Sequence, residues 1–250
     1  MNVLNPTTRL LAATMLLALG MPAMMAPAQE SPVPKKPSPP AQEEEKADKE
    51  EKPKVARVGK PAPNFALKDT KGKAHQLSSY AGNFVVLEWF NPGCPYCRGI
   101  YDKGVVEDIH KKIRQVNPEF VYLAINSTAN QPKDFIITQS DEFLEKQEMN
   151  EIPVLLDYDG TVGRLYEART TPHMFVIDPE GTLIYAGAIT DDRNFDKDDK
   201  ATNYVINAVR SSVSGIDVAP GTVRPWGCSV KYPDGGKGRK PRGRGPGRKP

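Results

Sequence analysis

The chain has 250 residues, of which 38% are hydrophobic and 24 are prolines, and its formal net charge at pH 7 is +3. This low hydrophobic share excludes a chain that is packed into a core from end to end. The small net charge excludes a strong polycation, although the distribution of charge differs between the two ends.

The N-terminus has the pattern of an export signal. Arg9 supplies a short positive region, an apolar run extends from Leu10 to Met21, and Ala26-Pro27-Ala28 provides small residues for a signal peptidase. The apolar run is shorter than the roughly 20 residues that a membrane helix needs. We therefore predict a signal peptide over 1–28 and an exported protein of the periplasm or cell envelope, with an uncleaved membrane anchor as the alternative.

Two further segments have compositions that do not form a core. Residues 29–57 are rich in Pro, Ala, Glu and Lys, and residues 233–250 are mostly Gly, Pro, Lys and Arg. Both segments bury too little apolar surface to offset the loss of chain entropy, so we predict a disordered linker and a disordered tail. The basic tail is expected to make weak contact with a polyanionic envelope surface rather than to recognise a specific nucleic acid.

Residues 58–232 have the pattern of one α/β domain. A nearly continuous apolar run over 84–90 predicts a strand buried on both faces, and a helical pattern follows over 95–115. Further strands are expected over 120–125, 152–156, 174–177 and 183–188, and further helices over 133–147, 162–168 and 201–214. Strands that alternate with helices and end in a hairpin predict a central mixed β-sheet flanked by helices.

The predicted strand over 84–90 leads into Cys94-Pro95-Tyr96-Cys97. Unpaired N–H groups and the helix dipole favour negative charge at a helix N-cap, so Cys94 is expected to be a reactive thiolate there. Pro95 suits the first helical position, which needs no N–H. Cys97 follows nearly one turn later, so the two cysteines are expected to close a disulfide, with Cys94 as the nucleophile and Cys97 as the resolving thiol.

Other interpretations of these cysteines stay open. The pair would be half of a zinc site if other ligands were near, or it would be a purely structural disulfide. Cys228 is either a second resolving thiol or a small residue packed under the C-terminal segment, and we favour the second. We predict no cofactor and no resident metal ion.

From Gly59 to about Ala188 the chain resembles the redoxin branch of the thioredoxin superfamily. The similarity is carried by Gly59-Lys60-Pro61-Ala62-Pro63-Asn64-Phe65, by the Cys-Pro-Tyr-Cys pair and by Thr171-Pro172 before an apolar strand. This branch includes alkyl-hydroperoxide-reductase/thiol-specific-antioxidant proteins and TlpA-like exported thiol–disulfide oxidoreductases. The resemblance implies a thioredoxin-like fold, exported client proteins with thiols or disulfides, and an upstream redox donor that it does not identify.

The resemblance also implies roles for individual residues. Pro172 would be a cis-proline beside the disulfide and would leave the Thr171 backbone free to pair with an extended client chain. Pro95 and Tyr96 are expected to contact the same client. Glu88 matches a buried carboxylate of thioredoxins that helps to move the proton of the resolving cysteine, and burial would raise its pKa. The alternative for Glu88 is a strand-edge glutamate that faces solvent.

Two departures from the family pattern bear on the reaction. Gly93 replaces the Trp that usually precedes the first cysteine, and Asn91 stands where peroxiredoxins carry Thr or Ser. Asn91 weighs against an efficient peroxidase. We therefore predict an exported thiol–disulfide oxidoreductase, with a thiol peroxidase that uses Cys94, or a metal- or copper-handling module on the same fold, as alternatives.

Overall fold

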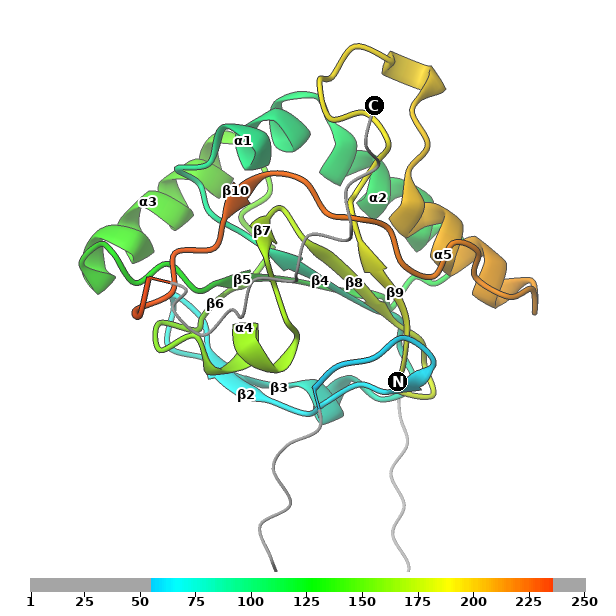
Figure 1. The fold of residues 1–250 in the computed structure, drawn as a ribbon, viewed down its shortest axis with the longest axis horizontal. Coiled ribbons are helices and arrows are strands. Elements are labelled where there is room, and N and C mark those ends of the chain that lie inside the picture. Colours follow the sequence, from blue (N-terminus) through cyan, green and yellow to red (C-terminus); the bar gives the residue numbers. More distant parts are fainter. Residues whose placement is uncertain (1–54, 236–250) are drawn as a thin grey trace, which may run out of the picture. The chain divides into compact units, whose positions relative to one another are not determined.

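A six-stranded β-sheet lies at the centre of residues 55–235, the part of the chain that the computed structural model describes (Figure 1). The strands are β1 (Lys60–Pro61), β2 (Ala66–Lys68), β3 (Ala74–Gln76), β4 (Val85–Trp89), β5 (Val121–Asn126), β6 (Val154–Leu156), β7 (Thr170–Thr171), β8 (Met174–Ile177), β9 (Thr182–Gly187) and β10 (Cys228–Ser229). The α-helices are α1 (Pro95–Asp102), α2 (Val105–Arg114), α3 (Lys133–Lys146), α4 (Thr161–Leu165) and α5 (Tyr204–Val213). Short 3₁₀ helices cover Leu77–Tyr80 and Asp198–Lys200.

The main sheet has the strand order β1-β9-β8-β4-β5-β6. Strand β4 is parallel to β5, and β5 is parallel to β6, whereas β4–β8, β8–β9 and β1–β9 are antiparallel pairs. The predicted mixed sheet is therefore confirmed. Two small antiparallel pairs, β2–β3 and β7–β10, lie outside it.

Strand β4 lies inside the sheet and separates two hydrophobic clusters. Val86 and Phe90 belong to the cluster that includes side chains of α1, α2, α3 and α5. Val85, Leu87 and Trp89 belong to the cluster that includes side chains of α4 and β2. Successive side chains of a strand point to opposite faces, and both faces are covered here (Figure 1), which explains why the run is apolar without alternation.

The predicted helix over 95–115 is two helices, so that prediction of one continuous element is wrong. Lys103 ends α1, and Gly104 precedes α2 with a φ of +69°. Glycine adopts this left-handed conformation without the steric penalty that a side chain would bring. The hydrogen-bond ladder is interrupted there, and α1, which begins directly after Cys94 and contains Cys97, is short.

Other boundaries differ by a few residues. The strand predicted over 152–156 begins at Val154, and the helix predicted over 162–168 covers Thr161–Leu165. The helix predicted over 201–214 begins later, because Asn203 is its N-cap and accepts a hydrogen bond from the Ile206 N–H at 3.1 Å.

Sequence reasoning missed the C-terminal strap, which we define as residues 218–234. It passes over the rest of the domain after α5 and includes β10 (Figure 1, orange to red). The carbonyl of Gly221 accepts a hydrogen bond from the Ala186 N–H at 3.1 Å, and the carbonyl of Lys231 accepts one from the Ala129 N–H at 2.8 Å. The strap is therefore joined by backbone hydrogen bonds to segments that are distant in sequence.

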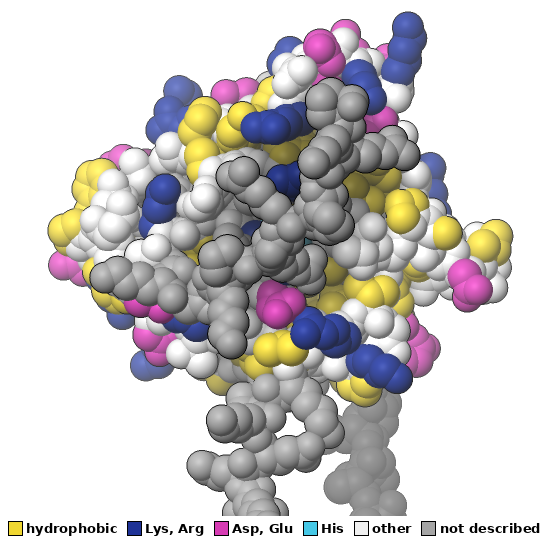
Figure 2. Space-filling model, in the orientation of Figure 1, with side chains coloured by type: hydrophobic (Ala, Val, Ile, Leu, Met, Phe, Trp, Pro, Cys, Tyr) yellow, Lys and Arg dark blue, Asp and Glu magenta, His cyan; other side chains and the backbone are white. Residues whose placement is uncertain are grey.

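The predicted signal peptide (1–28) and most of the predicted linker (29–57) and tail (233–250) lie outside the described residues. Ala56, within the predicted linker, is packed against the domain: it is buried, and its N–H donates a hydrogen bond to the Leu165 carbonyl at 2.9 Å. Within residues 55–235, no helix has the length and apolar character to cross a membrane. Acidic and basic side chains of the described residues are interspersed with hydrophobic ones on the face in Figure 2.

Candidate active site

The chain turns from β4 into α1 at Asn91-Pro92-Gly93. The Asn91 side chain accepts a hydrogen bond from the Gly93 N–H at 2.7 Å, and its carbonyl accepts one from the Cys94 N–H at 2.9 Å. Cys94 is the N-cap of α1 and Pro95 is in its first turn, as predicted. Free N–H groups of a first helical turn favour a negative charge, so this position suits a thiolate.

Three thiols meet at this helix end. Cys97 is fully buried, Cys94 is only 2% exposed, and Cys228 is partly exposed; none of the three forms a disulfide. The Cys94 Sγ lies 3.0 Å from the Thr171 carbonyl oxygen, to which Cys94 donates when it is protonated, and it also interacts with the thiols of Cys97 and Cys228. The prediction that Cys228 is only a small residue packed under the C-terminal segment is wrong, because strand pairing places Cys228 opposite Thr171 and its thiol interacts with that of Cys94.

The three thiols differ in their tendency to ionise. The hydrogen bond from Cys97 is the main cause that lowers the pKa of Cys94, and the neighbouring side chains of Cys228 and Thr171 act in the same direction. Burial raises the pKa of Cys97 well above its usual range, and burial together with the contact to Cys94 raises that of Cys228. The negative charge of this cluster therefore resides on Cys94.

Glu88 is buried on β4 on the same side of the sheet as Cys97. Its Oε2 accepts hydrogen bonds from the hydroxyls of Tyr101 at 2.9 Å and Tyr122 at 2.8 Å. Its Oε1 is buried without a hydrogen-bond partner among the described residues. Burial raises the pKa of Glu88 to about 7, and the carboxylate charge contributes to the raised pKa of Cys97. The alternative of a solvent-facing glutamate is wrong, since the exposed fraction of Glu88 is 0%.

Sequence reasoning missed Tyr101 and Tyr122. Tyr101 follows Cys97 by one turn of the same helix, and Tyr122 lies within the strand predicted over 120–125. A buried tyrosine hydroxyl needs a hydrogen-bond partner, and that requirement was the available signal.

The Thr171–Pro172 peptide bond is cis, as the resemblance implied. However, the Thr171 backbone is not free for an extended client chain, because β10 already pairs with β7 and places Cys228 opposite Thr171. The Thr171 hydroxyl is buried and has no hydrogen-bond partner within residues 55–235. It lowers the pKa of Cys94, which identifies Cys94 as the group to which this hydroxyl would donate.

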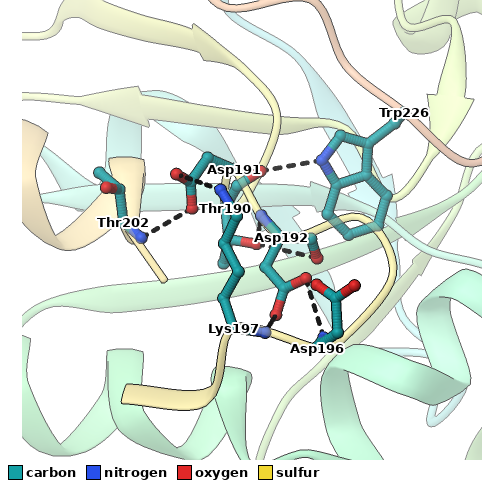
Figure 3. Close-up of polar contacts among 7 residues, drawn as sticks. All are labelled: Thr190, Asp191, Asp192, Asp196, Lys197, Thr202 and Trp226. Carbon is teal, nitrogen blue, oxygen red and sulfur yellow. Dashed lines mark hydrogen bonds and ion pairs between the residues drawn. The ribbon is translucent and has the colours of Figure 1, made fainter. Parts of the chain in front are cut away.

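Tyr96, between the two cysteines, is covered by side chains that the sequence did not connect with it. The indole of Trp226 lies with its centroid 5.9 Å from the Tyr96 ring, and Arg193 donates a hydrogen bond to the Tyr96 hydroxyl at 3.1 Å. The Trp226 N–H donates to the Thr190 carbonyl at 2.8 Å (Figure 3). Of the residues predicted to contact a client, Pro95 is the exposed one.

The His173 ring contacts neighbouring residues of the fold. Its ring centroid lies 4.4 Å from that of Phe175, and its Nδ1 accepts a hydrogen bond from the Arg169 N–H at 3.3 Å. In the described part of the chain, no group of three or more His, Cys, Asp or Glu side chains is arranged to hold a metal ion.

Curated relatives point to one enzyme class. The protein is 30% identical over 142 residues to the thiol–disulfide oxidoreductase ResA of Geobacillus kaustophilus, which covers 56% of this chain and 75% of that one. It is 28% identical over 127 residues to ResA of Bacillus thuringiensis subsp. konkukian, with 51% and 67% covered.

Solved structures show the same fold. A hypothetical protein of Sinorhizobium meliloti matches with a TM-score of 0.61 and 23% identity, over 72% of this chain and 97% of that one. An uncharacterized conserved protein of Geobacillus kaustophilus also matches with a TM-score of 0.61, at 21% identity, over 71% and 93%. The model of the AhpC/TSA family matches residues 58–186, which include Cys94, Cys97 and the cis-proline Pro172. The chain therefore belongs to the AhpC/TSA family and is a thiol–disulfide oxidoreductase.

Proposed function

We propose that the protein exchanges disulfides with exported client proteins through Cys94 and Cys97, in the periplasm or cell envelope. The observation that carries this proposal is the Cys94 thiol at the N-terminus of α1, whose pKa is lowered by neighbouring hydrogen-bond donors. A thiolate is the nucleophile in disulfide exchange, and a low pKa keeps it available at neutral pH. The signal-like sequence over 1–28 supports the proposed compartment.

Reduction of a disulfide takes two exchange steps. The Cys94 thiolate attacks one sulfur of a disulfide, the second sulfur leaves as a thiolate, and a mixed disulfide to Cys94 forms. Cys97 then loses its proton and attacks the Cys94 Sγ, which releases the remaining thiolate and closes the Cys94–Cys97 disulfide. The client gains two electrons from the two cysteines, one proton from Cys97 and a second proton from solvent. An external dithiol renews the pair by the reverse exchange.

Glu88 is proposed as the base for Cys97. Its pKa of about 7 allows the carboxyl to accept and return a proton near neutral pH. Tyr101 and Tyr122 hold it through Oε2, and the unpartnered Oε1 is the atom left to take the Cys97 proton. Thr171 is proposed to stabilise the Cys94 thiolate, beside Pro172.

Insulin reduction by the full chain, with dithiothreitol as donor, tests the proposal. Cys94→Ser is expected to abolish turnover, because the Cys94–Cys97 disulfide can then no longer form. Cys97→Ser is expected to stop after one exchange and to retain a disulfide on Cys94, seen by non-reducing mass spectrometry. Undiminished turnover in Cys94→Ser would refute the proposed role of the pair.

Peroxide consumption by the same variants addresses the peroxidase alternative. The Asn91 side-chain oxygen accepts a hydrogen bond from the Gly93 N–H, and Asn91 has no hydroxyl at the position where peroxiredoxins carry Thr or Ser. We therefore expect peroxide consumption to be slow compared with insulin reduction. A faster peroxide reaction that depends on Cys94 would favour the alternative.

The terminal segments are proposed to serve export and surface contact. Mass spectrometry of the exported protein is expected to find a chain that begins after Ala28. Deletion of residues 236–250 is expected to leave insulin reduction unchanged and to lower the salt concentration that elutes the protein from a polyanionic matrix.

A further inference from the structure

Cys228 occupies the position in which a client cysteine would be expected. An extended client chain pairs by strand addition with the backbone beside a cis-proline, which here is Thr171. In this structure β10 is the paired strand, with Cys228 opposite Thr171 and Ser229 opposite Thr170. The chain thus presents one of its own cysteines to Cys94, and this part of the strap lies beyond residues 58–186, which match the family model.

Gly227 allows the backbone of the strap to approach the Thr171–Pro172 peptide closely. It has a φ of +135°, and a Cβ at this position would collide with the Thr171 carbonyl and lie 3.1 Å from the Pro172 nitrogen. A glycine is needed here both for the backbone conformation and for the close approach. Because Gly227 directly precedes Cys228, this contact fixes the place from which the Cys228 side chain reaches Cys94.

Anchors on both sides hold Cys228 in place. On one side, the Trp226 indole donates to the Thr190 carbonyl at 2.8 Å and packs edge-on against Phe195 with centroids 6.0 Å apart. On the other side, the Val230 N–H donates to the Arg169 carbonyl at 3.2 Å. The strap is therefore held against the site by specific contacts on both sides of Cys228.

The loop that receives Trp226 is itself cross-linked by hydrogen bonds (Figure 3). The Asp192 carboxylate accepts from the N–H groups of Asp196 at 3.1 Å and Lys197 at 2.9 Å. The Asp191 carboxylate accepts from the Thr202 N–H at 2.8 Å and pairs with the Lys197 ammonium at 2.9 Å. This network gives the indole a fixed acceptor and so stabilises the position of the strap.

With the strap in place, Cys228 is the partly exposed thiol of the cluster, whereas Cys94 and Cys97 are buried. We propose that Cys228 is a third redox thiol, which exchanges with the external partner and passes the disulfide to Cys94 from its position on β10. This proposal deepens the proposed function and rests on it, because Cys94 and Cys97 remain the pair that stores the disulfide.

We call this transfer of the disulfide from Cys228 to Cys94 and then to Cys97 the relay. In client reduction, the Cys228 thiol passes its proton to the neighbouring Cys94 thiolate and attacks one sulfur of the client disulfide, and the other client sulfur leaves and takes that proton from Cys94. The Cys94 thiolate attacks the Cys228 Sγ, releases the second client thiolate and forms a Cys94–Cys228 disulfide. Cys97 then attacks the Cys94 Sγ, the Cys228 thiolate leaves, and the Cys94–Cys97 disulfide closes. The client gains two electrons from Cys94 and Cys97; the net proton loss of the protein is the one from Cys97, and solvent supplies the second proton.

The reverse exchange has a suitable leaving group. When an external dithiol attacks the Cys228 Sγ of a Cys94–Cys228 disulfide, Cys94 leaves as the thiolate that the surrounding hydrogen bonds stabilise. A thiol with a lower pKa leaves faster. Attack at Cys228, the more exposed sulfur, is therefore the faster exchange, because Cys94 is the leaving group.

The full chain with Cys97→Ser tests the relay directly. After reaction with insulin, the disulfide retained on Cys94 is expected to join it to Cys228, and peptide mapping by mass spectrometry identifies the partner. Cys97→Ser/Cys228→Ser is the control in which this linked peptide pair must be absent. A Cys94–insulin mixed disulfide in Cys97→Ser, without the internal disulfide, would overturn the relay.

Turnover gives a second, independent test. Cys228→Ser is expected to lower the rate of insulin reduction at least tenfold, whereas Ser229→Ala, at the exposed neighbouring position, is expected to leave it unchanged. An equal or higher rate in Cys228→Ser would overturn the relay and identify the strap as a cover. Loss of turnover in Cys94→Ser would still support the proposed function, so the two proposals fail separately.

Discussion

Replacement of Glu88 by Gln should remove a pH dependence from the stability of the fold. The pKa of Glu88 is raised from its ordinary value of 4.5 to about 7, chiefly by burial. The folded state therefore holds this proton more tightly than the unfolded state. The contribution of the carboxyl to stability is fully present below pH 4.5 and is lost as the pH rises to about 7. At about 1.4 kcal/mol for each pH unit, the loss is about 3 kcal/mol.

The assay is urea unfolding at several pH values between 5 and 8, followed by tryptophan fluorescence under reducing conditions. The two proteins compared are the chain with Glu88 and the chain with Glu88→Gln. Both should also carry Cys94→Ser, because the lowered pKa of Cys94 would otherwise add a pH dependence of the opposite sign to the free energy of unfolding. His110, whose pKa burial lowers to about 4, titrates equally in both proteins and cancels. The free energy of unfolding should fall with pH by about 2 to 3 kcal/mol more in the protein that retains Glu88. Parallel pH curves would refute the argument, since they would show that Glu88 ionises in its ordinary range.

Three further changes test the contacts around the thiols. Thr171→Val removes the unpartnered hydroxyl and should raise the pKa of Cys94 by about 1, seen in the ultraviolet absorbance of the thiolate; an unchanged pKa would exclude this donor. Gly227→Ala should lower the free energy of unfolding by about 2 kcal/mol more than Gly59→Ala, because both have a left-handed backbone but only Gly227 lacks space for a Cβ. Equal urea midpoints would contradict the close approach of the strap. Trp226→Phe keeps an aromatic ring but loses the hydrogen bond from the indole to the Thr190 carbonyl, so it should lower the free energy of unfolding by about 1 kcal/mol. An unchanged urea midpoint would show that this hydrogen bond does not stabilise the fold.

The main strands could be predicted from the sequence because their signals are local. The run over 84–90 is apolar at successive positions, as a strand covered on both faces must be, and β4 has that position. The break at Gly104 was missed, because a single glycine inside a helical pattern is tolerated and does not by itself end a helix. The two-residue strands β7 and β10 were missed as well, since so short a segment has no periodicity to detect.

For this protein, the sequence alone determined the Cys94–Cys97 pair and its place at the start of a helix, because an N-cap and a spacing of three residues depend only on neighbouring positions. Only the tertiary structure decided that Cys228 joins the pair. That contact depends on the pairing of β10 with β7 and on the close approach of Gly227, which involve segments far apart in the chain. The burial that raises the pKa of Glu88 likewise results from packing around β4. Local patterns therefore located the Cys94–Cys97 pair, and long-range packing determined which groups surround it.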